Sequence, residues 1–145
     1  MYILLFTFFL VSFLFLMPRI GFVKLSGMNS VEVSVLFGIR LASGLLLGWL
    51  THKYYPGNDY WSLNAESMQE TQLLHKDPST FFTSLFYNPY HGHWGGLFDA
   101  VGSFWKDLAN NLILKMIAFT NFLSGGNYYI NSLFFNFVGF FGSVA

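Results

Sequence analysis

Long apolar segments alternate with polar ones along this chain. Residues 1–17, MYILLFTFFLVSFLFLM, carry no charge, residues 32–51 are apolar apart from Glu32 and Arg40, and residues 127–145 form a third apolar run. A helix needs about 17–25 mostly apolar residues to cross the hydrocarbon core of a bilayer. The pattern therefore predicts three transmembrane helices over these ranges. No basic residue precedes the first run, unlike in a signal peptide, so we expect that helix to be retained.

The two polar segments between these runs differ in charge. The short segment 18–31 carries Arg19 and Lys24, whereas 52–126 is aromatic, rich in turns and richer in Asp and Glu than in Lys. Short loops with an excess of Lys and Arg stay in the cytoplasm. We therefore predict a cytoplasmic loop at 18–31 and an extracytoplasmic loop at 52–126.

Helical patterns recur inside the long loop. Residues 62–76 have helix-forming composition between Ser62, a possible cap, and Pro78. Residues 103–123 form an amphipathic pattern that suits a helix lying at the membrane interface. In this pattern Phe104, Leu108 and Leu112 share an apolar face, and the polar residues expected on the other side are Lys106, Asp107, Asn110 and Asn111.

Composition supports a membrane protein. Hydrophobic residues make up 54% of the chain and charged residues 10%, against about 25% charged in soluble domains. The predicted class is thus all-α, with the lipid bilayer and other membrane helices as partners. The formal net charge is zero, which argues against a nucleic-acid partner. The last apolar run ends at Ala145 without a polar flank, so we expect the N-terminal part of a longer polytopic protein.

Several side chains are candidates for chemistry. Asp59, after the turn YYPGN, is either a turn or helix-cap residue or a carboxylate that accepts a proton at a membrane surface. Glu66 and Glu70 are four residues apart on one helix face, where they either bind a divalent cation or substrate or form a solvated face. Arg40 either contacts a polar partner within the membrane or snorkels to its surface.

Metal and cofactor motifs are weak. His91 and His93 lie close together, but a zinc site needs three or four ligands, and we predict none. The chain has no cysteine and no glycine-rich phosphate loop or nucleophile-elbow motif. A divalent cation is the one cofactor left open.

The order of these parts resembles a known enzyme family. The segment after the second span contains, in order, DYWSLNAESM (59–68), the turn HKDP (75–78), an aromatic loop and an amphipathic helix. It resembles the first extracytoplasmic loop of GT-C glycosyltransferases. These polytopic enzymes, which include the dolichyl-phosphate-mannose protein mannosyltransferase-like group, take sugars from polyprenyl-phosphate donors. The resemblance covers roughly residues 33–145.

The resemblance implies roles for particular residues. Asp59 would be the catalytic base that deprotonates an acceptor hydroxyl. Tyr60 stands where the family often has a second acid, so Glu66 or Glu70 would supply that carboxylate as a substrate-binding residue. Lys53, at the end of the second span, would contact the lipid phosphate.

The chain also departs from the family. It has NPY (88–90) in place of a Pro-Pro element and one additional span before the family's first. We expect the protein to be an integral protein of the bacterial inner (plasma) membrane.

Two other classes of function remain open. One is a non-enzymatic membrane subunit or scaffold whose aromatic loop lies on the headgroups. A transporter is disfavoured, because the charges expected within the membrane are limited to Arg40 and Lys115.

Overall fold

The computed structural model describes residues 1–21, 23, 27–55, 59–92, 94–99 and 102–144. Every regular element in this part of the chain is a helix. An isolated antiparallel β-bridge also joins Asn88 and Gly92. The predicted all-α class is therefore confirmed.

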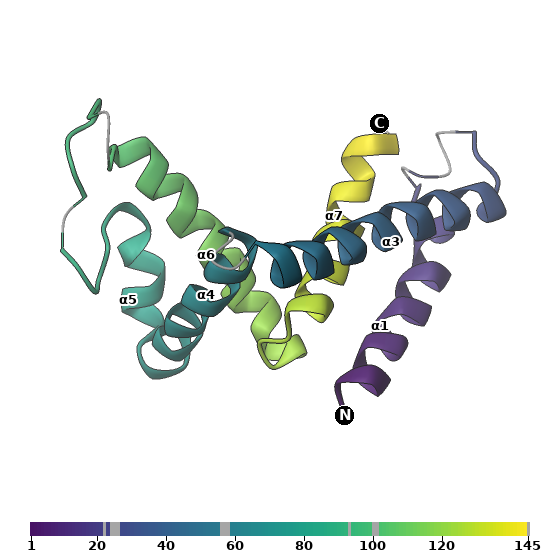
Figure 1. Cartoon of the computed structure of the whole chain (residues 1–145), viewed down its shortest axis with the longest axis horizontal. Helices are drawn as coiled ribbons and strands as arrows, with labels where there is room; N and C mark the ends of the chain where they lie inside the picture. Colours follow the sequence, from purple (N-terminus) through teal and green to yellow (C-terminus); the bar gives the residue numbers. More distant parts are fainter. Residues whose placement is uncertain (22, 24–26, 56–58, 93, 100–101, 145) are drawn as a thin grey trace. The chain divides into compact units, whose positions relative to one another are not determined.

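The helices fall into two compact units. Met1–Asn58 and Asn127–Ala145 form unit 1, and Asp59–Gly126 forms unit 2. Unit 1 contains α1 (Tyr2–Leu16), the 3-10 turn η1 (Met17–Arg19), α3 (Ser30–Tyr54) and α7 (Tyr128–Val144). Unit 2 contains α4 (Asp59–Lys76), α5 (Pro78–Thr83), the 3-10 turn η2 (Ser84–Phe86) and α6 (Phe104–Ser124) (Figure 1). The predicted loop of 52–126 corresponds to unit 2 preceded by the last turn of α3.

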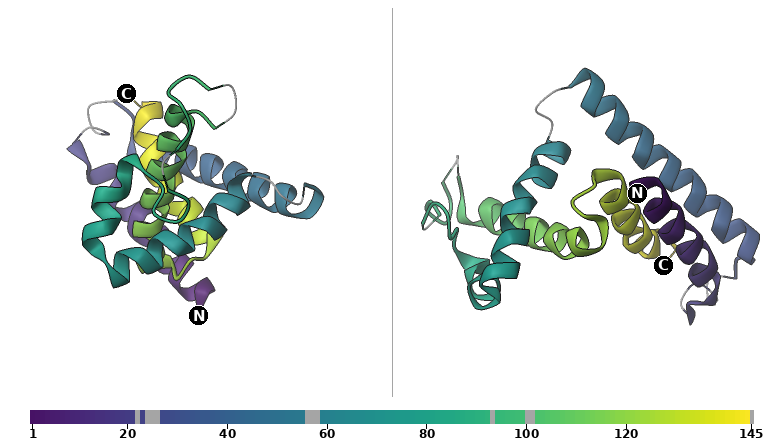
Figure 2. Two further views of the ribbon diagram at one scale, coloured as in Figure 1. Left: turned by 90° about the vertical axis from the view of Figure 1, so that its left-hand side faces the viewer. Right: turned by 90° about the horizontal axis from the view of Figure 1, so that it is seen from below.

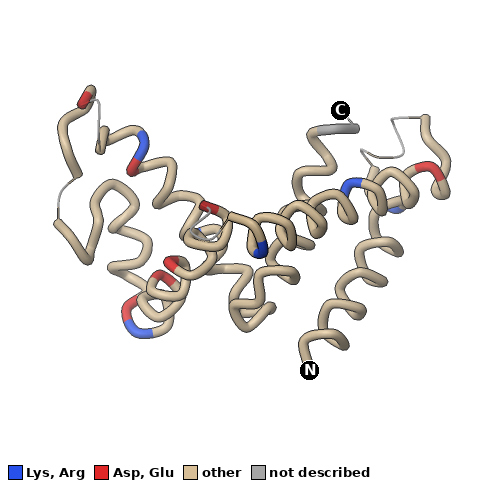
Figure 3. The backbone as a smooth tube through the Cα atoms, viewed as in Figure 1, with Lys and Arg blue, Asp and Glu red and all other residues tan. Residues whose placement is uncertain are grey.

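Two of the described helices are long and apolar enough to cross a membrane. They are Tyr2–Arg19 and α3, with mean hydropathies of 1.9 and 1.8. Within the apolar 18-residue stretch of each, only 11% and 22% of the residues are buried, unlike in a core helix of a water-soluble domain, which is largely covered. α7 has 17 residues and no charged side chain, and the span predicted there stays a prediction (Figure 3).

The start of α3 is fixed by a capping box. The Asn29 side chain accepts hydrogen bonds from the backbone N–H groups of Val31 and Glu32, and the Glu32 carboxylate accepts one from the Asn29 N–H at 2.8 Å. These contacts satisfy N–H groups that have no partner within the helix. Glu32 therefore has a capping role at the first turn of α3.

An aromatic core holds α1, α3 and α7 together. The Phe13 ring of α1 stacks on Phe137 of α7 at 4.1 Å between centroids, and Phe37 of α3 meets Phe140 edge-on at 5.7 Å. Figure 2 shows α7 alongside α1. Aromatic pairs at these distances add about 0.5–1.5 kcal/mol each to the burial of their surface. Phenylalanine packing thus accounts for much of the cohesion of unit 1.

Glycines bring α3 close to α7. A Cβ atom on Gly48 would lie 2.6 Å from Cε1 of Tyr128, and one on Gly44 would lie 2.8 Å from Nδ2 of Asn136. Small residues allow this close approach between helices in lipid. By contrast, a Cβ on Gly38 of the same helix would meet no atom within 4 Å.

This contrast predicts different costs for the same substitution. Gly48→Leu is expected to lower the free energy of unfolding by about 1–3 kcal/mol, because the new side chain overlaps the Tyr128 ring. Gly38→Leu, the matched control, is expected to have little effect. Denaturant unfolding of the two variants in detergent micelles compares them, and equal losses would show that α3 and α7 do not pack as described.

Candidate functional site

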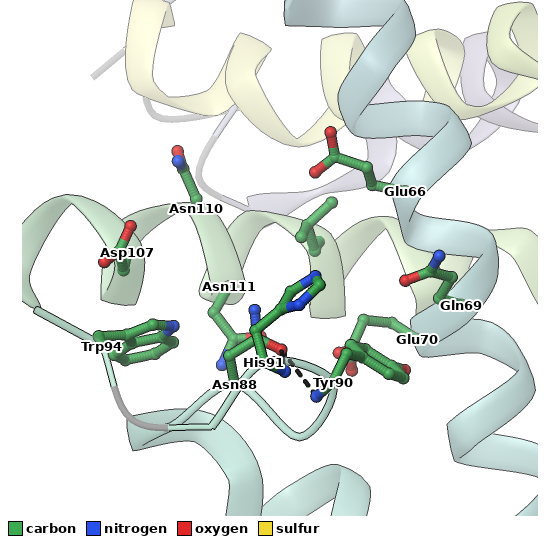
Figure 4. A pocket seen from close by; sticks show the side chains of 11 residues that line it. Glu66, Gln69, Glu70, Asn88, Tyr90, His91, Trp94, Asp107, Asn110 and Asn111 are labelled. Atoms are coloured by element: carbon green, nitrogen blue, oxygen red, sulfur yellow. Dashed lines mark hydrogen bonds between the residues drawn. The ribbon is translucent and has the colours of Figure 1, made fainter. Parts of the chain in front are cut away.

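A polar pocket of about 400 Å³ lies in unit 2. Three segments form it: α4, the loop after η2, and α6 (Figure 4). Its lining residues are Glu66, Gln69, Glu70, Asn88, Tyr90, His91, Trp94, Asp107, Asn110, Asn111 and Leu114. Carboxylates, amides, an imidazole and two aromatic rings thus surround one cavity, which makes it the leading candidate site.

Both glutamates predicted from the sequence line this pocket, but in different surroundings. Glu66 is exposed, whereas Glu70 is 3% exposed. The Glu70 carboxylate forms an ion pair with Lys115 of α6, with 2.9 Å between Oε2 and Nζ. The interpretation of the pair as a solvated face is therefore wrong for Glu70.

Lys115 connects three segments of unit 2 from its interior. Besides the ion pair, its ammonium donates to the Phe81 carbonyl at 2.6 Å and to Ser84 Oγ at 3.0 Å. It also lies 4.2 Å from the centroid of the Phe81 ring. A buried charge needs such a set of partners because it has lost its hydration. The lysine thus holds Glu70 in the pocket wall.

Two asparagines of α6 also point inward. Asn111 donates to the carbonyls of Ser84 and Leu85 at 2.8 and 2.9 Å. Asn121 donates to the hydroxyls of Ser67 and Thr71 at 3.0 and 2.8 Å. Asn111 was expected with Lys106, Asp107 and Asn110 on the side opposite the apolar face, whereas it is buried and its amide donates to carbonyls of η2.

The loop side of the pocket is shaped by Asn88. Its Oδ1 accepts the backbone N–H of Tyr90 at 2.8 Å, drawn in Figure 4, and that of His91 at 3.3 Å. The bridge to Gly92, whose φ is 82°, closes this turn. Trp94 packs edge-on against Phe104 of α6, with 5.6 Å between centroids. Side-chain-supported turns of this kind fix loop residues without regular structure.

Tyr90 and Glu70 both line the pocket, and the carboxylate lies near enough to the phenol to affect its ionisation. Loss of hydration, and then the negative charge and hydrogen bond of Glu70, raise the pKa of Tyr90 to about 12. All three causes disfavour the phenolate. The hydroxyl is therefore a hydrogen-bond donor throughout the neutral range.

This shift predicts a loss of stability at high pH. The unfolded chain releases the Tyr90 proton near pH 10 and the folded chain near pH 12, so the contribution of Tyr90 is complete below pH 10 and is lost as the pH rises to 12. Unfolding of the wild type and of Tyr90→Phe is to be compared at pH 8 and pH 11. We expect the wild type to lose more stability than the variant; an equal loss would contradict the contact with Glu70.

Asp59 and Lys53 lie outside the pocket lining. Asp59 is exposed at the first residue of α4, where an acidic side chain interacts favourably with the helix dipole. It precedes Glu66 by seven residues, which is roughly 10 Å along a helix. Lys53 is exposed in the last turn of α3 in unit 1, and its ammonium lies 5.0 Å from the centroid of Trp49. The pocket brings Glu66 and Glu70 together but not these two residues.

The HKDP turn has a structural role. Asp77 is the N-cap of α5, and its carboxylate accepts hydrogen bonds from the Thr80 hydroxyl at 2.5 Å and the Thr80 N–H at 3.1 Å. The Thr80 hydroxyl lowers the pKa of Asp77, because it stabilises the ionised form.

A metal site is not assembled in the described part of the chain. No three of its His, Asp and Glu side chains are placed to hold one ion together. The partner of Glu70 is Lys115 rather than a cation, and His93 lies outside the described residues. The divalent cation stays a prediction.

Sequence reasoning missed most of the pocket. Asn88, Tyr90, Trp94 and Asp107 were not singled out for binding, because no motif connects them. One feature of the sequence could have indicated a buried polar site here: Lys115 is a charged residue within an apolar run, four residues after Asn111.

Comparison with protein-family models, curated proteins and solved structures finds no match. Any function must therefore be supported by the chemistry of the pocket and by its place in the chain.

Proposed function

We propose that this chain is an integral membrane protein and the N-terminal part of a glycosyltransferase. It would transfer a sugar from a polyprenyl-phosphate donor to an extracytoplasmic acceptor. The observation that supports this proposal is the pocket: a cavity lined by carboxylates, amides and aromatic rings, in a unit that begins five residues after the end of α3. Carboxylates and amides hydrogen bond to sugar hydroxyls, and an aromatic ring covers the apolar face of a pyranose.

In this proposal the residues have separate tasks. Glu66 hydrogen bonds to the sugar, while Glu70, fixed by Lys115, and the Tyr90 hydroxyl form the wall behind it. Asp59 takes the proton of the acceptor hydroxyl. The acceptor oxygen then bonds to the anomeric carbon as the bond from that carbon to the lipid phosphate breaks. The phosphate leaves on its lipid, and Lys53 balances its charge.

A second function is favoured by one observation. Asp59 does not line the pocket, so the pocket could bind a sugar without reaction. The chain would then be a binding subunit or scaffold, and its ligand would leave unchanged. The glycosyltransferase and the binding subunit would use the same pocket, but only the glycosyltransferase would convert the bound sugar donor to product.

A transfer assay separates the two. The full-length protein is reconstituted in proteoliposomes with labelled polyprenyl-phosphate sugars and with a hydroxyl-bearing acceptor. The enzyme proposal predicts time-dependent release of the polyprenyl phosphate together with labelled acceptor. Saturable binding without release would support the binding subunit, and neither binding nor release with any tested sugar would overturn both.

A further inference from the structure

The outer face of α6 is an unbroken apolar stripe. It consists of Trp105, Ala109, Leu112, Met116, Phe119 and Leu123. These positions are spaced by four and three residues, so they follow one side of the helix along its whole length. The five large side chains among them are between 45% and 57% exposed. Phe82 of α5, 61% exposed, continues the stripe beside Phe119, with 6.1 Å between ring centroids.

The buried face of the same helix is mostly polar, with Ile117 and Ala118 as its apolar members. Asn111, Lys115 and Asn121 are at most 6% exposed, and each is hydrogen bonded within unit 2. Ser67, Glu70 and Ser84 complete this buried polar cluster. A surface helix of a water-soluble domain has the opposite arrangement, with its apolar side toward the core. Polar side chains that face inward, away from an apolar outer surface, are instead typical of helices in contact with lipid.

The chain itself places this stripe near a bilayer. α4 begins five residues after the end of α3, and α7 begins four residues after the end of α6. α3 is long and apolar enough to span a membrane and exposes Val31, Ile39 and Leu46 at 56–71%. Unit 2 therefore cannot move far from the membrane surface. An apolar stripe tethered there meets acyl chains before it meets any soluble partner.

We propose that the stripe of α6, with Phe82, lies in the membrane interface and contacts the acyl chains of the lipids. The helix lies along the surface, because the stripe runs over about five turns of α6. The immersed face is centred on Met116, not on the Phe104, Leu108 and Leu112 face expected from the sequence. The polar cluster around Lys115 then lies on the side away from the lipid.

The absence of cysteine makes the test direct, since one introduced cysteine gives one labelled site. Nitroxide labels are placed at Leu112, Met116 and Phe119 in the full-length protein in phospholipid nanodiscs. Asn110 of α6 and Gln72 of α4, both exposed polar residues, serve as controls. Collision rates with oxygen, which dissolves in lipid, and with a water-soluble nickel chelate are measured at each site.

We expect the ratio of oxygen to nickel collisions to be severalfold higher at the stripe positions than at the controls. Similar ratios at both sets would show that the stripe faces water and would overturn the proposal. Low collision rates with both reagents on the stripe would show that another helix covers it, which would also overturn the proposal. Quenching of native Trp105 by lipids with brominated acyl chains, in a variant whose other three tryptophans are Phe, checks the result without a label.

Discussion

Asp59→Asn is expected to lower sugar transfer by about 10²–10⁴-fold, the usual contribution of a general base. Asparagine has nearly the same shape as aspartate and cannot accept the acceptor proton. Asp59 is exposed at the start of α4, so the change is expected to leave stability within about 0.5 kcal/mol of the wild type. The measurement is the initial rate in proteoliposomes, with donor binding measured in parallel and expected to be unchanged.

Glu66→Gln is the matched control for that experiment. Glu66 lies in the pocket on the same helix, and its amide variant keeps the hydrogen-bonding shape. If Glu66 binds sugar without accepting a proton, the variant mainly weakens donor binding. Full activity of Asp59→Asn together with loss of turnover in Glu66→Gln would transfer the base role to Glu66 and contradict the assignment made here.

Lys115→Met is expected to lower the free energy of unfolding by about 3–5 kcal/mol, which is the usual cost of removing one partner of a buried ion pair. The pair is deeply buried, with the side chains of Lys115 and Glu70 7% and 3% exposed. Methionine fills a similar volume but leaves the buried Glu70 carboxylate without its ion-pair partner. The Phe81 carbonyl also loses its donor at 2.6 Å. Denaturant unfolding in detergent micelles measures the loss.

The double variant Glu70→Met/Lys115→Met shows whether the loss comes from the unpaired charge. Replacing both members of a buried pair by apolar residues is often neutral or stabilising. We therefore expect the double variant to be more stable than Lys115→Met alone. Additive losses would show that the two side chains do not interact and that the interior of unit 2 is not built around them.

Local patterns predicted the helices of unit 2 well. The expected helix of 103–123 is observed as α6, Phe104–Ser124, because Ser103 caps its start and Gly125, with φ 62°, ends it. The helix expected at 62–76 ends as predicted at Lys76 but begins at Asp59. Ser62 does not cap the helix. Its hydroxyl donates to the Asp59 carbonyl at 3.1 Å inside the first turn.

The interior of unit 2 could not be predicted in this way. Periodicity within residues 103–123 shows which side chains share a face but not which face is covered. That depends on Glu70, which lies 45 residues before Lys115 in the chain. The pocket has the same origin, because α4, the Asn88 loop and α6 approach one another only after folding.

Photolabelling tests the central claim that the pocket of unit 2 receives a lipid-linked sugar. A polyprenyl-phosphate sugar with a diazirine on the sugar ring is bound to the full-length protein in nanodiscs, irradiated, and the labelled residues are located by mass spectrometry. We expect label on Tyr90, Trp94 or Asn110, which line the pocket, and competition by the unmodified donor. Competable label found only on α1, α3 or α7 would contradict a sugar site in unit 2.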